Sequence, residues 1–272
     1  MGLSSNILWH QTTKDVLKKI LKERSFKYSY SLEYIETKTC KLECAFPMLS
    51  LCNIPFADID DYLTKYGGNS IGLSRDWGLK HGITPVIYCE PTSNLLESCI
   101  EIIKLRLDDD DNIKSFLVNL LSHIKNHEGV LPKYNYKKYR FYDEHEARII
   151  PSFDELQQSN YEPILLKKEY QVYKLRNNKK SLLSKNLSIP FSYDDIRYFI
   201  LKDENSINEI KEILSKTIDL NKLNISFFTI QQVKEDFIGI NHNEILAINK
   251  IYINDKHHDN FPPINEKINL NK

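Results

Sequence analysis

One 26-residue block, Lys65–Glu90, constrains the fold of this chain more than any other segment; it reads KYGGNSIGLSRDWGLKHGITPVIYCE. Glycines at Gly67-Gly68 permit a tight turn before a short apolar strand at Ser70–Leu73. Ser74 can then cap one helical turn, because its hydroxyl accepts a hydrogen bond from a free backbone N–H. A second strand, Pro85–Tyr88, begins with proline, where the missing donor does least harm. The block predicts helices and strands mixed along one chain.

Outside this block, apolar residues recur at helical spacing in several segments. The predicted helices are Thr13–Glu23, Asp58–Thr64, Thr92–Leu107, Ile113–His127, Phe153–Gln158, Ser206–Lys216 and Ile230–Phe237. In the third and fourth of these, the apolar side chains that we expect to point inward include Leu95, Ile102 and Phe116. The four aspartates between them, Asp108–Asp111, lack calcium-loop spacing and favour a solvated linker.

Short apolar runs predict the strands Ile7–Trp9, Ala45–Cys52, Ala147–Ile150, Ile196–Leu201 and Ile225–Thr229, whereas Tyr28–Ile35 fits a strand or an ordered loop. Because these runs are scattered along the sequence, we expect a single α+β domain over residues 1–255. Its central β-sheet would have flanking helices. The Lys- and Asn-rich segment 167–186 is expected to form a mobile loop, and residues 256–272 a polar, frayed tail.

The charge balance bears on the kind of partner. Lys and Arg number 37 and so do Asp and Glu, so nothing in the bulk charge favours nucleic-acid binding. No apolar run is long enough to span a bilayer, and no signal peptide is recognised. The five cysteines lie in apolar contexts without zinc-site spacing. We therefore predict a cytoplasmic protein with reduced thiols, no metal site and no membrane contact.

A second informative segment is FYDEHEARIIP, which crowds ionisable residues beside an apolar run that Pro151 ends. On a strand, Glu144, Glu146 and Arg148 would share one face and His145 would take the other. Carboxylates against an apolar wall acquire shifted pKa values, which is typical of a functional pocket. The alternative is an exposed ion-pair ladder, worth only about 0–1 kcal/mol. The sequence leaves both interpretations open.

Two further candidate features lie in the first third of the chain. His10 ends the first predicted strand, where a histidine can bind a ligand hydroxyl or act as acid or base; a core or capping histidine is the alternative. Tyr66, Gly67 and Ser70 surround a turn that lets the backbone approach a ligand closely, or that simply connects two elements. No Lys-Ser/Thr follows the glycines, so this is not a P-loop.

The segment Lys133–Phe141, KYNYKKYRF, interleaves aromatic and basic residues. That pattern suits stacking on bases and holding phosphates, as in an RNA-binding module. An exposed edge strand whose lysines lie along apolar surface explains it as well.

The order LWHQT, FPMLSLCNIPF, KYGGNSIGLSRDWGLKHGITPVIY, FYDEHEARIIP and YDDIRYFILKDENSINEI resembles the AbiGi-type abortive-infection proteins of bacteria, over roughly residues 1 to 240. The YG-x-x-x-IGLS-x-x-WG-x-x-x-G-x-x-PV-x-Y block carries most of the resemblance. The family's E-x-EWR-like motif corresponds to Glu144, Glu146 and Arg148, with Ala147 in place of the aromatic residue. The resemblance implies phage defence by the antitoxin-like member of a toxin–antitoxin pair, with a nucleotidyltransferase-like toxin as partner.

The layout is also distantly similar to ADP-ribosyltransferase folds, in which a His, a Tyr and a Glu hold NAD. That similarity implies catalytic roles for Glu146, His10 and Glu144, and NAD as the cofactor if the chain is an enzyme. Tyr66, Gly67, Ser70 and Arg148 would complete a nucleotide-binding pocket. The competing hypotheses are a non-catalytic antitoxin, whose polar residues belong to the core, and the RNA-binding module.

Overall fold

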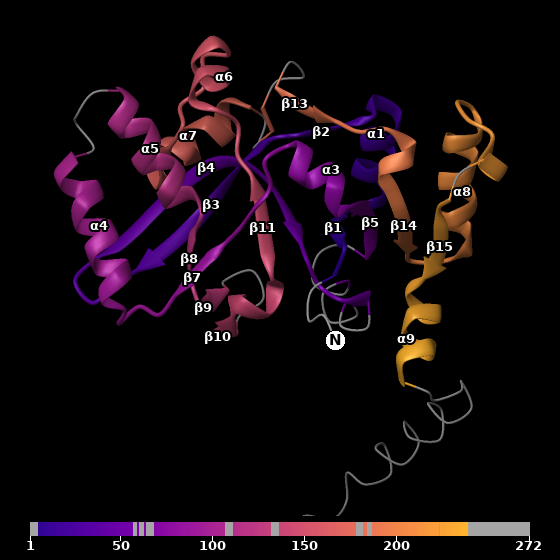
Figure 1. Ribbon diagram of the computed structural model, residues 1–272, viewed down its shortest axis with the longest axis horizontal. Helices are drawn as coiled ribbons and strands as arrows, with labels where there is room; N and C mark the ends of the chain where they lie inside the picture. Colours follow the sequence, from indigo (N-terminus) through magenta and orange to yellow (C-terminus); the bar gives the residue numbers. More distant parts are fainter. Residues whose placement is uncertain are drawn as a thin grey trace, which may run out of the picture.

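The central feature of the computed structural model is a nine-stranded sheet with helices packed against it (Figure 1). The structure describes residues 5–56, 59, 63, 68–106, 111–131, 136–177, 182–183, 187–222 and 224–238. The predicted helix Asp58–Thr64 lies largely outside these residues, and Tyr66, Gly67 and the tail 256–272 lie wholly outside them. The predicted α+β class, with a central sheet and flanking helices, is confirmed.

The strands of the main sheet follow the order β15-β14-β5-β1-β4-β11-β6, with β3 and β12 also paired to β4. These strands are β1 (Ile7–Thr12), β3 (Ser29–Glu36), β4 (Lys41–Cys52), β5 (Asn69–Ser74), β6 (Thr84–Pro85), β11 (Glu146–Ile149), β12 (Leu165–Leu166), β14 (Ile196–Leu201) and β15 (Ser226–Thr229). Two-stranded pairs are formed by β2 (Ser25–Lys27) with β13 (Ser188–Pro190), β7 (Ile87–Cys89) with β8 (Ile124–Asn126), and β9 (Glu128–Leu131) with β10 (Tyr136–Arg140).

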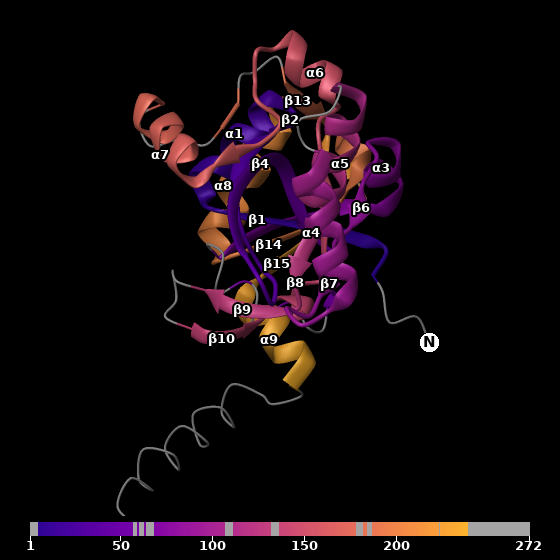
Figure 2. The same cartoon turned by 90° about the vertical axis from the view of Figure 1, so that its left-hand side faces the viewer.

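The helices are α1 (Lys14–Glu23), α3 (Arg75–Lys80), α4 (Asn94–Arg106), α5 (Asp111–Ser122), α6 (Phe153–Gln158), α7 (Lys167–Arg176), α8 (Glu204–Ser215) and α9 (Ile230–Ile238). In Figure 1, α4 and α5 lie at one end of the sheet, whereas α8 and α9 lie at the other end beside β14 and β15. Figure 2 places α6 and the β9–β10 pair at opposite ends of the molecule. None of the described helices is long and apolar enough to cross a membrane.

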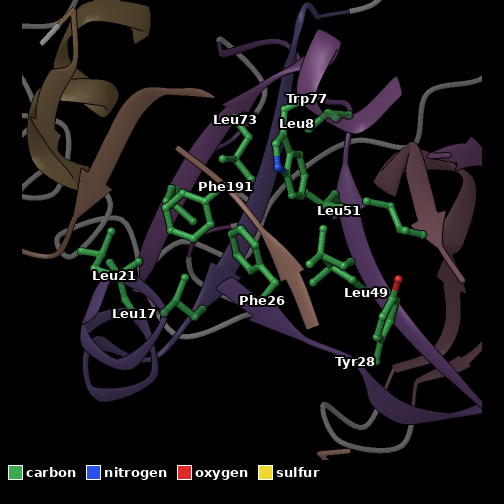
Figure 3. Packing of buried hydrophobic residues seen from close by; sticks show 14 of the residues in the cluster. Leu8, Leu17, Leu21, Phe26, Tyr28, Leu49, Leu51, Leu73, Trp77 and Phe191 are labelled. Carbon is green, nitrogen blue, oxygen red and sulfur yellow. The ribbon is translucent and has the colours of Figure 1, made fainter. Parts of the chain in front are cut away.

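The largest hydrophobic core joins α1, α3 and α8 to the strands β1 and β5. Figure 3 shows Phe26 and Phe191 near its middle, with their ring centroids 5.2 Å apart. Trp77 closes the same core, 5.6 Å from Phe26, and donates its indole N–H to the carbonyl of Pro190. Ser74 caps α3 by accepting from the backbone N–H of Trp77, as the sequence predicted.

Two predictions about individual elements are wrong. The segment Lys167–Arg176 forms the helix α7, whereas the sequence predicts a mobile loop over 167–186. No side chain of α7 is fully buried, so the segment lacks the apolar stripe that signals a helix. The helix predicted over Ile113–His127 ends at Ser122, because the next residues pair with β7 as strand β8.

Side chains that we expected to point inward from α4 and α5 are partly at the surface. Leu95 is 60% exposed, Ile102 53% and Phe116 70%. Both faces of α4 carry apolar residues, so the spacing alone does not tell which face meets the sheet. The face that does meet the core carries Leu96, Ile100 and Ile103.

Candidate functional site: a buried ionic cluster beside a cavity

The pairing of β11 with β4 positions the two central charges of the site. Glu146 lies opposite Cys52 and Arg148 opposite Ser50, and both charged side chains are buried. Glu144 belongs to the 3-10 helix η3 (Phe141–Glu144), not to the strand. His145, with a φ of 43°, turns the chain between them, and its side chain is exposed. Glu144 and Glu146 nevertheless converge, as predicted, but through a turn and not through strand alternation.

The carboxylate of Glu146 accepts hydrogen bonds from three side chains. Arg148 donates to Oε1 from Nε at 2.8 Å and to Oε2 from Nη2 at 3.1 Å. The Ser50 hydroxyl donates to Oε1 at 2.7 Å, and Lys125 Nζ donates to Oε2 at 2.7 Å. Each oxygen therefore has two donors, which fills the usual acceptor capacity of a carboxylate.

Two more carboxylates complete the cluster. Arg148 donates from Nη2 to Glu33 at 2.9 Å and from Nη1 to the carbonyl of Ser122 at 2.6 Å. Glu144 lies 3.3 Å from Lys125 Nζ and accepts from the Tyr139 hydroxyl at 3.0 Å. The ionic cluster, defined as Glu33, Lys125, Glu144, Glu146 and Arg148, thus alternates anions and cations in the interior.

Sequence reasoning missed Glu33, Lys125 and Ser50, which come from β3, β8 and β4. The available signal was a charged residue inside an apolar strand: Glu33 lies between Tyr30 and Ile35, and all three are buried. A buried charge needs a partner, but the sequence does not say which distant residue supplies it.

The ion pairs set the ionisation of the cluster. Burial by itself raises the pKa of Glu146, but the cations of Arg148 and Lys125 outweigh it and hold that pKa well below its usual range. Burial by itself lowers the pKa of Lys125, but Glu146, Glu33 and Glu144 outweigh it and raise that pKa. The pKa of Arg148 is raised in the same way, against its own burial, by Glu146 and Glu33. All three side chains are therefore charged at neutral pH.

These shifts predict a loss of stability in acid. The pKa of Glu146 is lower in the folded state than its unfolded value of about 4.3, so its contribution is complete above that pH and is lost as the pH falls below it. We expect the free energy of unfolding, measured with urea from pH 7 to pH 3, to fall most steeply below about pH 5. Glu146→Gln should reduce that slope, and equal slopes in the two proteins would contradict this account.

A cavity of about 640 Å³ adjoins the cluster. It lies where β4 changes neighbours: β3 pairs with β4 up to Ser29↔Met48, and β1 pairs with it only at Trp9↔Cys52. The predicted site residues that border the cavity are His10, Glu144 and Glu146. Its volume lies within the range of small-molecule pockets, about 300–1,000 Å³.

The other predicted site residues are not in the cavity wall. Ser70 is fully buried in β5, and its hydroxyl donates to the backbone carbonyl of His10 at 3.4 Å. Arg148 is enclosed by its ion pairs. The two remaining candidates, Tyr66 and Gly67, lie outside the described residues. Three of the seven predicted residues thus border one cavity, and nucleotide binding there stays a prediction.

The basic and aromatic segment does not form an open stacking surface in its described part. Tyr139 is 8% exposed and bonded to Glu144, so its ring is not available to a base. Lys138 pairs with Glu128 at 2.9 Å, and Arg140 pairs with Asp143 at 2.8 Å. Within the described residues, no group of three or more His, Cys, Asp or Glu side chains could hold a metal ion.

Fold and site together define an α+β protein with a buried, internally paired ionic cluster next to a ligand-sized cavity. The model of the family described as "Putative abortive phage resistance protein AbiGi, antitoxin" matches residues 14–203. A relative named "Abortive phage resistance protein AbiGi", from Lactococcus lactis subsp. cremoris, is 32% identical over 216 residues, which are 68% of this chain and 85% of that protein. The chain belongs to the AbiGi family. No solved structure matches it, and the ADP-ribosyltransferase-like arrangement stays a prediction.

Proposed function

We propose that this protein is a non-catalytic antitoxin of an abortive-infection pair, which acts by binding a partner toxin. The single observation that carries the proposal is the saturation of Glu146: its two oxygens already accept four hydrogen bonds from Arg148, Lys125 and Ser50. A carboxylate that stabilises a developing charge on a substrate needs a free oxygen. The description of the matching family names an antitoxin, which supports the same conclusion.

The cluster has a ready structural explanation. Its members come from β3, β8, β11 and the 3-10 helix η3, so their ion pairs tie together segments that are far apart in the sequence. Breaking such a pair is costly, because it leaves a charge without a partner in a low-dielectric interior. A purely structural role therefore accounts for Glu144, Glu146 and Arg148 together.

Co-expression tests the antitoxin function. The toxin would be the product of the adjacent reading frame whose expression alone arrests growth. We expect this chain to restore growth when both are expressed, and the two proteins to purify as a stable complex. Phe26→Asp, which puts a charge into the aromatic core, should abolish both effects. Growth arrest or phage protection by this chain without any partner would contradict the proposal.

A second candidate function is nucleotide recognition in the cavity, favoured by the position of His10. This side chain lies deep in the molecule yet keeps accessible surface, because the cavity reaches it. NAD binding with ADP-ribosyl transfer would be one form of this function. The filled carboxylate of Glu146 weighs against transfer, but it leaves ligand binding possible.

A further inference from the structure

The cavity has a hydrogen-bond acceptor of fixed orientation in its wall. His10 Nδ1 lies 3.3 Å from the carbonyl of Ser50, and since a carbonyl can only accept, Nδ1 carries the hydrogen. Burial lowers the pKa of His10, an effect that this hydrogen bond only partly offsets, so the ring is neutral at pH 7. Phe26 packs edge-on against it at 5.2 Å. The ring nitrogen left for a ligand is Nε2, with its lone pair.

Side-chain donors that have no protein partner among the described residues border the same space. Ser25, Ser29 and Ser31 line the cavity, and none of their hydroxyls hydrogen-bonds another side chain or the backbone within the described residues. Gln11 also borders it, and its side-chain Nε2 is buried with no hydrogen-bond partner in the same part of the chain. A buried donor such as Gln11 Nε2 is rarely left unpaired in folded proteins, whereas the three serines are only partly buried. A ligand with ring nitrogens, carbonyls or hydroxyls would satisfy them.

The charges around the cavity limit how many phosphates a ligand can carry. Lys27 pairs with Glu23 at 2.8 Å, and Lys125 pairs with Glu144 and Glu146. Lys19, on the exposed side of α1, is the one bordering lysine that has no ion pair within the described residues. The bordering carboxylates would repel a pyrophosphate or a triphosphate, whereas a single phosphate can be neutralised by one lysine.

We propose that this cavity binds a nucleoside-type ligand that carries at most one phosphate group. The apolar part of the wall, which includes Phe26 and Leu49, contacts the base, while His10 Nε2 accepts from a base N–H or a sugar hydroxyl. A phosphate, where present, lies at the mouth against Lys19. This proposal rests on the second candidate function above. It excludes NAD and nucleoside triphosphates from the ligands expected for that function.

Isothermal titration of the purified full-length chain tests the proposal. The probes are adenosine, guanosine, cytidine, uridine, their 5′-monophosphates, ATP and NAD. We expect saturable binding of at least one nucleoside or monophosphate, and weaker or no binding of ATP and NAD. The proposal would be overturned if no nucleoside or monophosphate binds, or if ATP or NAD binds more tightly than every monophosphate.

Three variants locate the ligand. His10→Ala should weaken binding about tenfold, the value of one good hydrogen bond. Lys19→Ala should weaken the binding of a monophosphate about fivefold, the effect of losing one solvent-exposed ion pair. The binding of the matching nucleoside should be unchanged. Lys22→Ala is the matched control, an exposed lysine of α1 away from the cavity, and should change neither. Equal effects of Lys19→Ala and Lys22→Ala would place the phosphate elsewhere. Because titration uses the isolated chain, its failure leaves the toxin-binding result unaffected.

Discussion

Replacing Arg148 with methionine should destabilise the protein by about 3–5 kcal/mol, the usual cost of removing one partner of a buried ion pair. Arg148 is fully buried and bonded to Glu146, Glu33 and the carbonyl of Ser122. Methionine keeps most of the side-chain volume, so the loss comes from the two carboxylates left without this cation. Urea denaturation followed by circular dichroism measures it.

Arg140→Met is the matched control for that variant. Arg140 also pairs with an acidic residue, Asp143, at 2.8 Å, but both side chains are more than half exposed. An exposed pair contributes about 0–1 kcal/mol, so this substitution should change the midpoint little. Similar losses in the Arg148 and Arg140 variants would mean that the cluster does not hold the interior together.

Glu146→Gln should cost about 2–3 kcal/mol, less than the loss of Arg148. Glutamine has nearly the same shape, and its carbonyl oxygen can still accept from Ser50 or Arg148. In this variant Lys125 still pairs with Glu144 and Arg148 still pairs with Glu33, so each cation keeps a carboxylate partner. The free energy of unfolding in urea at pH 7 measures the loss. Glu212→Gln is the control, since its i,i+4 pair with Lys216 is about two-thirds exposed. A loss no larger than that of the control would contradict the structural role of Glu146.

Elements with a strong local signal could be predicted from the sequence. The helix Phe153–Gln158 and the strand Ile196–Leu201 have the predicted bounds, because each has an apolar pattern and clear end signals. Ser152 forms a capping box with Glu155, and Pro151 precedes it. The helix α7 was missed because its stability depends on contacts with β3, β4 and β12, which no local pattern shows.

The candidate site could be predicted only in part, for the same reason. Glu144, Glu146 and Arg148 lie close together in the sequence, so their shared environment could be inferred from one segment. Their partners Glu33 and Lys125 are supplied by strands whose pairing and register are set by the whole sheet. The cavity could not be predicted either, because it forms where β1 and β3 leave part of one edge of β4 unpaired.

The measurement that tests the central claim most directly is toxin neutralisation by Glu146→Gln. Growth should be scored in cells that co-express the toxin, at a temperature where circular dichroism shows the variant to be as folded as the wild type. If the protein is a non-catalytic antitoxin, the wild type, Glu146→Gln and Glu212→Gln should give the same colony counts. Failure of folded Glu146→Gln, with full rescue by Glu212→Gln, would contradict the account, because the Glu146 carboxylate would then be needed for neutralisation itself and not only for folding.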